Sequence, residues 1–370
     1  MRYWLLLGLV VLHLPSLEAR CTVEQSGQAW IIETDALRLE IDAAAGGRIS
    51  SWLLKETGEE MLVPYRQRRE QLSPLLPEQV TSNNGGWKDL AWRKSLPESS
   101  PMKVLKKQSG EEVLLVLEGE YLGSRLTRQF RVSDGSGVIR LDVTFENVGK
   151  AAMTLDYWSH ALLNPEVFLS GGAGVVEFEA DGKTHLVRDK KTETIAHVGL
   201  TRAVVHEGYY FLAPSGAWLA RLAPKSHTAL LVGLPPVIPD GMLLSVWQSA
   251  QAASLEMIFP PTVLAPGKAV TFPMILAAVP AVEKPLAWLG GALVYREGGI
   301  VKARALDRSG FGVLEMPGGA EVSLKSLVPV QVGASDALQE GLIVLHHDGR
   351  VYRGDFAPET AELTLKTRNH

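Results

Sequence analysis

The chain has 370 residues, one cysteine and a formal net charge of −4 at pH 7. A single cysteine excludes an intramolecular disulfide, so the hydrophobic core must hold the fold, and this length has room for more than one domain. The small negative charge gives no electrostatic basis for binding nucleic acid or an anionic membrane, and we expect neither as a partner.

The N-terminus has the pattern of a secretory signal peptide. Arg2 provides a positive charge, the stretch from Tyr3 to Leu14 is nearly unbroken in apolar residues, and Ala19 is a small residue at a cleavage point. We predict a signal peptide over residues 1–19 and a secreted or periplasmic protein. Cys21 leaves lipid attachment as an alternative to a free thiol, although the arginine before it stands where lipid attachment normally requires Gly or Ala. No later segment is long and apolar enough to span a membrane.

Most of the chain after this segment shows the alternation of short antiparallel strands. Apolar residues alternate with others in two stretches, and Gly, Pro, Asn and Asp separate the apolar runs. The alternating residues are Ile31, Leu37, Leu39 and Ile41 within 29–41, and Val113, Leu115 and Leu117 within 112–120. Many short strands over about 250 residues predict a large antiparallel sandwich. We therefore predict an all-β fold class, with this sandwich at residues 25–280.

A second unit is predicted to begin after Glu283-Lys284-Pro285, where the proline marks a joining segment. The strands beyond it are separated by compact turns such as Pro317-Gly318-Gly319 and Asp348-Gly349-Arg350. We predict a small β-module over residues 286–370. His346 and His347 are adjacent, so on a strand their side chains point to opposite faces, and we expect no metal site and no cofactor.

The most polar, glycine-rich and aromatic segment of the chain is Thr81–Trp92. Its amides and charged groups could hydrogen-bond sugar hydroxyls, and a tryptophan could stack on a sugar face. We therefore predict substrate-binding roles for five of its residues: Asn83, Asn84, Trp87, Lys88 and Asp89. The structural alternative is a glycine turn held by two tryptophans that pack on the sandwich.

Two separate segments each place one proton-transfer group among apolar and aromatic residues. Asp156–Pro165 contains His160, and Ser254–Pro261 contains Glu256. An unpaired carboxylate in an apolar strand is costly, so Glu256 needs a partner or an exposed cleft. Each residue has a structural alternative: a histidine with a satisfied hydrogen bond, and an edge-strand glutamate facing water. Trp158, close to His160, suits either the core or a platform that binds a sugar ring.

In this order and with these flanks, the two segments resemble the catalytic histidine and glutamate segments of the aldose 1-epimerases, or galactose mutarotases. The similarity covers residues 29–279 and includes the three segments that open this region: Asp35–Asp42, Gly46–Trp52 and Thr57–Glu60. It implies a galactose mutarotase-like antiparallel supersandwich, followed here by the small C-terminal β-module. That superfamily also contains lyases, hydrolases and binding domains, so its fold carries less weight than the site.

The resemblance makes Glu256 the catalytic base and His160 the catalytic acid. Opening a pyranose requires one group to remove the proton from the anomeric hydroxyl and another to protonate the ring oxygen. We therefore expect both side chains on one concave face, on the order of 5–8 Å apart, so that a sugar ring fits between them. The sequence departs from the family pattern after both residues, at Ala161–Asn164 and Met257–Ile258, and the family's early Asn-Arg pair is not evident.

The predicted function is a secreted carbohydrate-binding protein of the mutarotase-like class, with an isomerase of the aldose 1-epimerase type as its enzymatic form. A sugar or glycan is the expected partner. Two alternatives stay open: a non-catalytic cell-envelope protein that binds or assembles glycans, and a polysaccharide lyase or hydrolase on the same scaffold. A glycoside hydrolase needs two carboxyl groups beside the glycosidic bond that it cleaves, and Glu256 is the one carboxylate that the sequence places in a recognisable motif.

Overall fold

The computed structural model describes residues 21–64, 85–91, 101–121, 123–168 and, with short gaps, 174–365. The gaps are at 180–182, 189–190, 197–199, 206–207, 214–217, 224–225, 235–238, 249–252, 335–336 and 357–360. The predicted signal peptide and two of the predicted sugar-binding residues, Asn83 and Asn84, lie outside these ranges. Within them, no helix has the length and apolar character needed to cross a membrane.

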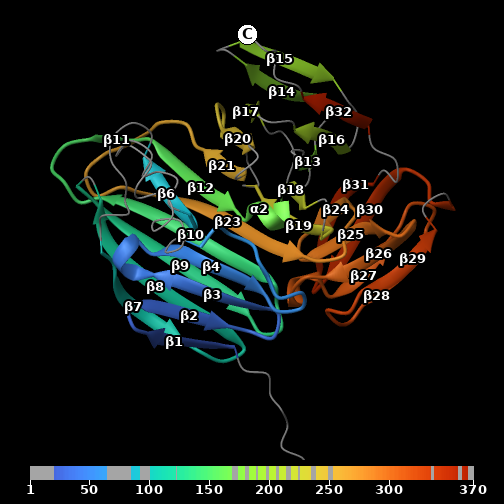
Figure 1. Cartoon of the computed structure of the whole chain (residues 1–370), viewed down its shortest axis with the longest axis horizontal. Helices are drawn as coiled ribbons and strands as arrows, with labels where there is room; N and C mark the ends of the chain where they lie inside the picture. The colour runs from blue at the N-terminus through green and yellow to red at the C-terminus, as the bar shows by residue number, and fades with distance from the viewer. Residues whose placement is uncertain are drawn as a thin grey trace, which may run out of the picture.

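Two large sheets form most of the molecule (Figure 1). The first has twelve strands in the described part of the chain, and short β5 (Glu59–Glu60) pairs with β4 at its side. Its other strands follow in the order β1 (Thr22–Ser26), β2 (Ala29–Glu33), β3 (Leu37–Asp42), β4 (Arg48–Leu54), β6 (Trp87–Ala91), β12 (Tyr157–Leu163), β21 (Ala253–Ile258), β20 (Leu243–Gln248), β17 (Gly208–Ala213), β14 (Lys183–Arg188) and β15 (Lys191–Ala196).

The second sheet has ten strands in the same part of the chain, and its last strand comes from the C-terminal region. The order is β32 (Ala361–Leu365), β16 (Leu200–Val205), β13 (Gly174–Glu179), β18 (Trp218–Ala223), β19 (Thr228–Gly233), β23 (Ala269–Val279), β10 (Val138–Asn147), β9 (Ser124–Ser133), β8 (Glu112–Tyr121) and β7 (Lys103–Gln108). Neighbouring strands are antiparallel except β32 and β16, which run parallel.

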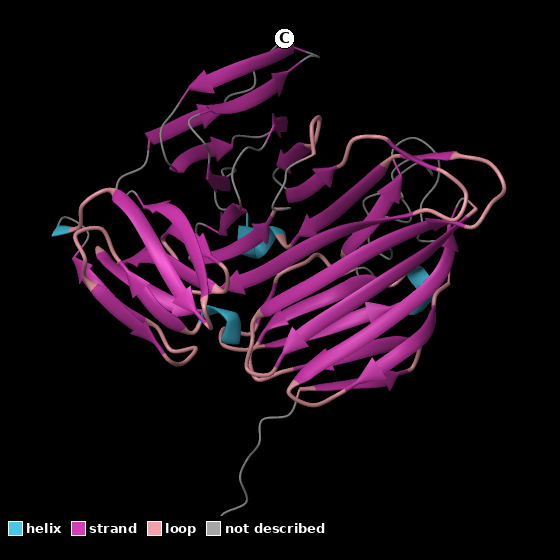
Figure 2. Ribbon diagram, turned by 180° about the vertical axis from the view of Figure 1, so that it is seen from behind, coloured by secondary structure: helices cyan, strands magenta, loops and turns pink. Residues whose placement is uncertain are grey.

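Smaller elements complete the fold. A two-stranded ribbon joins β11 (Met153–Leu155) to β22 (Thr262–Leu264). Strands dominate the ribbon diagram (Figure 2). The short helical turns include η1 (Ala43–Ala45), α2 (Pro165–Phe168) and η4 (Arg308–Gly310). The prediction of an all-β fold is confirmed.

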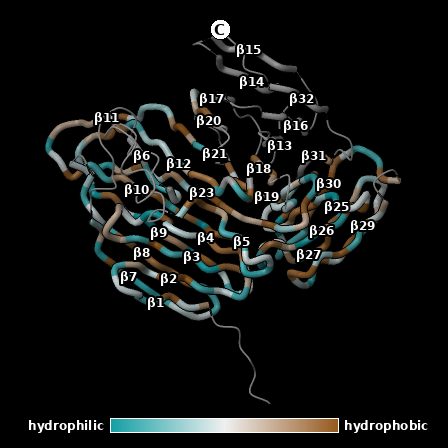
Figure 3. The backbone as a smooth tube through the Cα atoms, viewed as in Figure 1, coloured by the Kyte–Doolittle hydropathy of each residue, from teal (hydrophilic) through white to brown (hydrophobic). Residues whose placement is uncertain are grey.

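Alternating side chains explain how the two sheets pack. In β9, Leu126, Phe130 and Val132 are buried, whereas the residues at 125, 127, 129 and 131 are partly or fully exposed. The same alternation of hydrophilic and hydrophobic positions runs along the neighbouring strands (Figure 3). The inward residues of both sheets form one hydrophobic core, as period-two side chains in a sandwich do. Arg128 is the charged exception in this strand, because it also points inward and is fully buried.

The single cysteine lies inside this core. Cys21 stands directly before β1, its side chain has no exposed surface, and its Sγ–H donates to the carbonyl of Gly110 over 2.9 Å. Burial raises the pKa of the thiol above its ordinary value of 9.0.

Residues 284–356 form two four-stranded sheets of their own. One has the order β24 (Lys284–Leu289), β25 (Ala292–Glu297), β26 (Ile300–Ala305) and β29 (Val330–Ala334); the other has β28 (Glu321–Leu324), β27 (Gly312–Glu315), β30 (Gly341–His347) and β31 (Arg350–Phe356). They share a core that includes Leu286, Val294, Leu314 and Leu345. The last strand, β32, lies outside these sheets and belongs to the ten-stranded sheet. The predicted module at residues 286–370 therefore stays a prediction, and β32 does not fit it.

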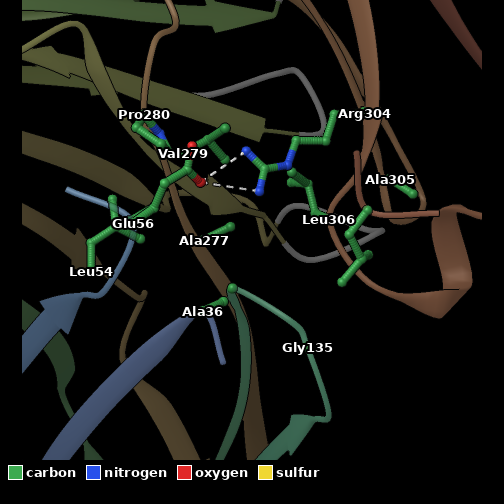
Figure 4. A pocket seen from close by; sticks show the side chains of 13 residues that line it. Ala36, Leu54, Glu56, Gly135, Ala277, Val279, Pro280, Arg304, Ala305 and Leu306 are labelled. Carbon is green, nitrogen blue, oxygen red and sulfur yellow. Dashed lines mark hydrogen bonds and ion pairs between the residues drawn. The ribbon is translucent and has the colours of Figure 1, made fainter. Parts of the chain in front are cut away.

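A second hydrophobic cluster joins these small sheets to the ten-stranded sheet. Trp218 and Leu231 of the large sheet pack in it with Trp288, Leu293 and Tyr295. A small cavity lies along the same joint, and Figure 4 shows two of its lining residues pointing toward each other, with Arg304 Nη2 and Glu56 Oε2 3.3 Å apart. Residues 284–356 are therefore packed firmly against the outer face of the sandwich.

Candidate functional site

Three neighbouring strands of the twelve-stranded sheet bring the predicted proton-transfer residues together. In register, Lys88 of β6 lies opposite His160 of β12, and His160 lies opposite Glu256 of β21. Their strand neighbours Trp87, Ala161 and Leu255 belong to the core between the sheets. Because side chains alternate across a strand, the row Lys88–His160–Glu256 lies on the other face of the sheet. These three residues are only 1–3% exposed.

A glycine pair allows β6 to enter the sheet at this point. Gly86 has a φ of +74°, and a Cβ atom there would lie 2.5 Å from the carbonyl oxygen of Ile49. Its N–H donates to Val63 over 2.8 Å, and its carbonyl accepts from the N–H of Leu162 over 3.1 Å. A glycine suits both the left-handed φ and the close backbone approach. The glycine-rich segment noted in the sequence therefore places Lys88 beside His160.

His160 and Glu256 are in direct contact. His160 Nε2 lies 3.6 Å from Glu256 Oε1, and the same oxygen accepts a 2.6 Å hydrogen bond from Ser254 Oγ. The expected separation of one sugar ring is therefore wrong. The physical reason is the register, because directly opposed residues on antiparallel strands have Cβ atoms only about 4.5–5.5 Å apart. Glu256 is also no edge-strand residue, since β21 pairs with β12 on one side and β20 on the other.

The surroundings of His160 keep its imidazole uncharged. Burial lowers the pKa of His160 well below its ordinary value of 6.5, and the positive charges of Lys88 and Arg48 lower it further. The indole of Trp158 meets the imidazole edge-on, with ring centroids 5.8 Å apart. Nδ1 of His160 is buried and has no hydrogen-bond partner among the described residues. A neutral imidazole with one unsatisfied nitrogen is suited to bind a hydroxyl group.

Two of the predicted sugar-binding residues point the other way. Trp87 is fully buried between the sheets, where its Nε1 donates to Ser159 Oγ over 2.8 Å. Asp89 lies on the same side and pairs with Arg128, whose Nε is 3.2 Å from Asp89 Oδ2. Both predictions are corrected here: neither side chain reaches the face of His160. Period two is the cause, because residues 87 and 89 must point away from residue 88.

Trp158 and Lys88 do lie on the face of His160. Trp158 precedes His160 by two positions on β12 and is partly exposed, so its ring lies beside the imidazole on that face, and its role as a platform for a sugar stays a prediction. Asn83 and Asn84 lie outside the described residues.

The sequence analysis missed Arg48 as part of this site. Its side chain is fully buried, its Nη1 donates to the carbonyl of Gly85 over 3.2 Å, and its charge acts on His160. The sequence signal is Gly46-Gly47-Arg48, a segment that also belongs to the family resemblance.

Known proteins resemble this chain in structure and not in sequence. No family model and no curated protein matches the sequence. A galactose mutarotase-like protein from Lactobacillus casei superposes with a TM-score of 0.50 and 12% identity, over 68% of this chain and all of that one. The chain has a galactose mutarotase-like fold. This likeness confirms the family resemblance read from the sequence as a resemblance of fold.

Two further solved structures are similar in fold to this chain. A protein from Synechocystis sp. PCC 6803 matches with a TM-score of 0.51 and 14% identity, over 69% of this chain and 96% of that one. A TPR-domain containing protein from Parabacteroides distasonis matches with a TM-score of 0.51 and 13% identity, over 68% of this chain. The match spans 47% of the Parabacteroides protein, about half its length. At these sequence identities the comparisons show the fold, and the activity has to be argued from the residues of the site.

Proposed function

We propose that this chain is a carbohydrate-binding protein of the mutarotase-like class, with its site at Lys88, His160 and Glu256 and with Trp158 as the aromatic platform. The observation that carries the proposal is the unsatisfied Nδ1 of the neutral, buried His160 beside the Glu256 carboxylate. A buried polar atom without a partner is costly, and a sugar hydroxyl can both donate to and accept from this pair. The galactose mutarotase-like fold supports the choice of ligand class.

Binding is better supported than epimerase chemistry. A sugar ring does not fit between Nε2 and Oε1 at 3.6 Å, so a sugar would lie above the pair rather than between acid and base. An imidazole with a strongly lowered pKa is also scarcely protonated at neutral pH, which weakens His160 as a general acid. Epimerase chemistry stays the enzymatic form of the proposal because Glu256 and His160 remain paired in register.

The binding proposal is tested with protein lacking residues 1–19 on a broad glycan array, followed by calorimetry on the glycans retained. Trp158→Ala and His160→Gln should abolish retention. His346→Gln is the matched control, because His346 forms a similar contact with Glu315 at 3.5 Å in a different sheet, and this variant should bind as the wild type does. Equal loss in His346→Gln, or retention by His160→Gln, would place the binding site elsewhere.

The enzymatic form is tested by polarimetry of freshly dissolved D-glucose and D-galactose. An epimerase would speed relaxation of at least one sugar, and Glu256→Gln would lower that rate by about 10²–10⁴-fold because the variant keeps the shape but loses the proton acceptor. Glycan retention without faster relaxation would assign binding alone. If no glycan is retained and the optical rotation of neither sugar relaxes faster, the protein has another function, and binding of a protein partner becomes the better hypothesis.

Export is the other part of the proposal. The charge, apolar run and small residue within positions 1–19 support cleavage after Ala19. Mass spectrometry of the protein recovered from a periplasmic fraction should find a chain that begins at Arg20. Recovery of the uncleaved chain from the cytoplasm alone would contradict it.

A further inference from the structure

A buried polar network lies directly behind the proposed site, on the core side of β6 and β12. Arg128 of β9 pairs with Asp89 of β6 across the two sheets, with Nε and Oδ2 3.2 Å apart. Tyr157 of β12 donates its hydroxyl to the other oxygen of Asp89 over 2.7 Å. Arg128 Nη1 also donates to the carbonyl of Gly47, at the turn before β4. All three side chains are buried, the arginine completely.

Stability alone does not account for a charge pair at this place. The surroundings are aromatic, since the ring of Tyr157 lies 5.4 Å from Phe145 and 4.4 Å from Phe272 between centroids. Taking a carboxylate and a guanidinium out of water is expensive, and replacing such a pair by apolar residues of similar volume is often neutral or stabilising. The groups also carry directional hydrogen bonds, from Tyr157 to Asp89 and from Arg128 to the Gly47 carbonyl, and these fix the relative position of strands that apolar packing would leave free to slide.

The network is joined strand by strand to the residues of the site. Asp89 follows Lys88 in β6 and lies in register with Ser159, the residue before His160. A second cross-strand bond, from Trp87 to Ser159, holds the same register from the core side. Gly47, held by Arg128, precedes Arg48. The groups that act electrostatically on His160 are therefore attached to strands or turns that this network holds.

We propose that Arg128, Asp89 and Tyr157 are positioning residues, which hold Lys88 and Arg48 against His160 from behind the sheet. Their purpose, a preorganised sugar site, rests on the function proposed above. The positioning itself can be measured at His160 without any sugar, so the two proposals can fail separately.

The test is nuclear magnetic resonance of ¹⁵N-histidine-labelled protein, with the signals of His160 assigned by their loss in His160→Gln. Tyr157→Phe removes one hydrogen bond to Asp89 and keeps the ring packing. The double variant Asp89→Leu/Arg128→Met removes both charges. In each variant, the ring ¹⁵N shifts of His160 should change, and the pKa of His160 should rise toward 6.5 as Lys88 and Arg48 move away and water enters.

Tyr295→Phe is the matched control, because that tyrosine is equally buried but lies at the interface between the sandwich and the C-terminal sheets. This variant should leave the His160 shifts and pKa unchanged.

The His160 signals distinguish positioning from a structural role. The double variant leaves the buried Tyr157 hydroxyl and the Gly47 carbonyl without their partners, so it should unfold at a lower urea concentration than the wild type. A loss of stability alone would not shift the His160 signals of the folded protein. If those signals stay in place in both Tyr157→Phe and the double variant, the positioning proposal is overturned, whether or not the protein binds glycans. If the double variant does not fold, Tyr157→Phe decides by itself. Shifted His160 signals in a protein that retains no glycan would support the positioning and overturn the sugar-binding function.

Discussion

His160 takes its chemical character from the two strands beside it. β6 presents an ammonium group and β21 a carboxylate, and the sheet buries all three side chains. Burial and the two nearby cations favour the neutral imidazole, which can bind a ligand through Nδ1 but carries little protonated form at neutral pH. At this scale the proposed site is therefore better suited to hydrogen bonding than to proton donation.

Protonation of His160 should contribute to the pH dependence of the protein's stability. Because the pKa of folded His160 lies below its unfolded value of 6.5, the unfolded chain takes up this proton first as the pH falls. The stability attached to the neutral imidazole is present above pH 6.5 and is lost as the pH falls toward the lower folded-state pKa. We expect the Tm of His160→Gln to fall less steeply than that of the wild type between about pH 6.5 and pH 5.

Differential scanning calorimetry over this range checks the prediction, and the difference between the two proteins is the quantity to compare. Glu60 acts in the opposite sense, because burial raises its pKa above 4.5 and its contribution is lost as the pH rises. It is present in both proteins, so its effect cancels. Parallel Tm curves would mean that His160 is not held in the neutral form by the fold.

At the scale of elements, β6 shows where reasoning from sequence succeeds and where it ends. The polar composition of Thr81–Trp92 drew attention to Lys88, which lies opposite His160 in the sheet. For Trp87–Ala91 the sequence predicts part of a sugar-binding loop, because a five-residue strand with a lysine and an aspartate gives too short a periodic signal. Which of its side chains face the core depends on pairing with β12, a contact between residues far apart in the chain.

The glycine entrance to β6 supports a prediction on backbone geometry. Gly86→Ala places a Cβ atom 2.5 Å from the Ile49 carbonyl at a φ of +74°. We expect a loss of about 2–3 kcal/mol in the free energy of unfolding, from the left-handed φ and the backbone clash together. Gly123→Ala is the matched control, since φ there is +79° and nothing lies within 4 Å of the added Cβ.

Urea unfolding at equilibrium measures both variants. Gly123→Ala should lose about 1–2 kcal/mol, the cost of the φ angle alone. An equal loss in the two proteins would show that β6 shifts easily to admit the methyl group and that Gly86 is not needed for its close approach.

At the scale of the whole molecule, the sequence predicted the fold class, whereas the roles of the two residues that the resemblance marks, His160 and Glu256, stay predictions. It could not give their 3.6 Å contact, because the register between β12 and β21 is set by the assembled sheet. The proline near residue 285 predicted a new unit, and separate sheets do begin there. The return of β32 to pair with β16 left no local signal, because a parallel pairing between distant segments is decided by the finished fold.

The joint between the sandwich and the C-terminal sheets should make the molecule unfold as one unit. Besides the cluster around Trp288, Arg140 Nη2 of β10 lies 2.6 Å from Oδ2 of the buried Asp307, which also accepts from the N–H of Ser309. Apolar packing and an ion pair therefore both cross the joint. When such an interface is large and hydrophobic, two units share their stability and lose it together.

Trp288→Ala should uncouple the two parts. Truncating a buried tryptophan costs about 3–5 kcal/mol, and here the lost contacts are those between the C-terminal sheets and β18 and β19. Calorimetry should then resolve two transitions in place of one. Trp30→Ala removes a similarly buried tryptophan from the sandwich core alone and should lower Tm without splitting the transition. A single transition in Trp288→Ala would show that the remaining contacts, such as Arg140 with Asp307, are enough to couple the two parts.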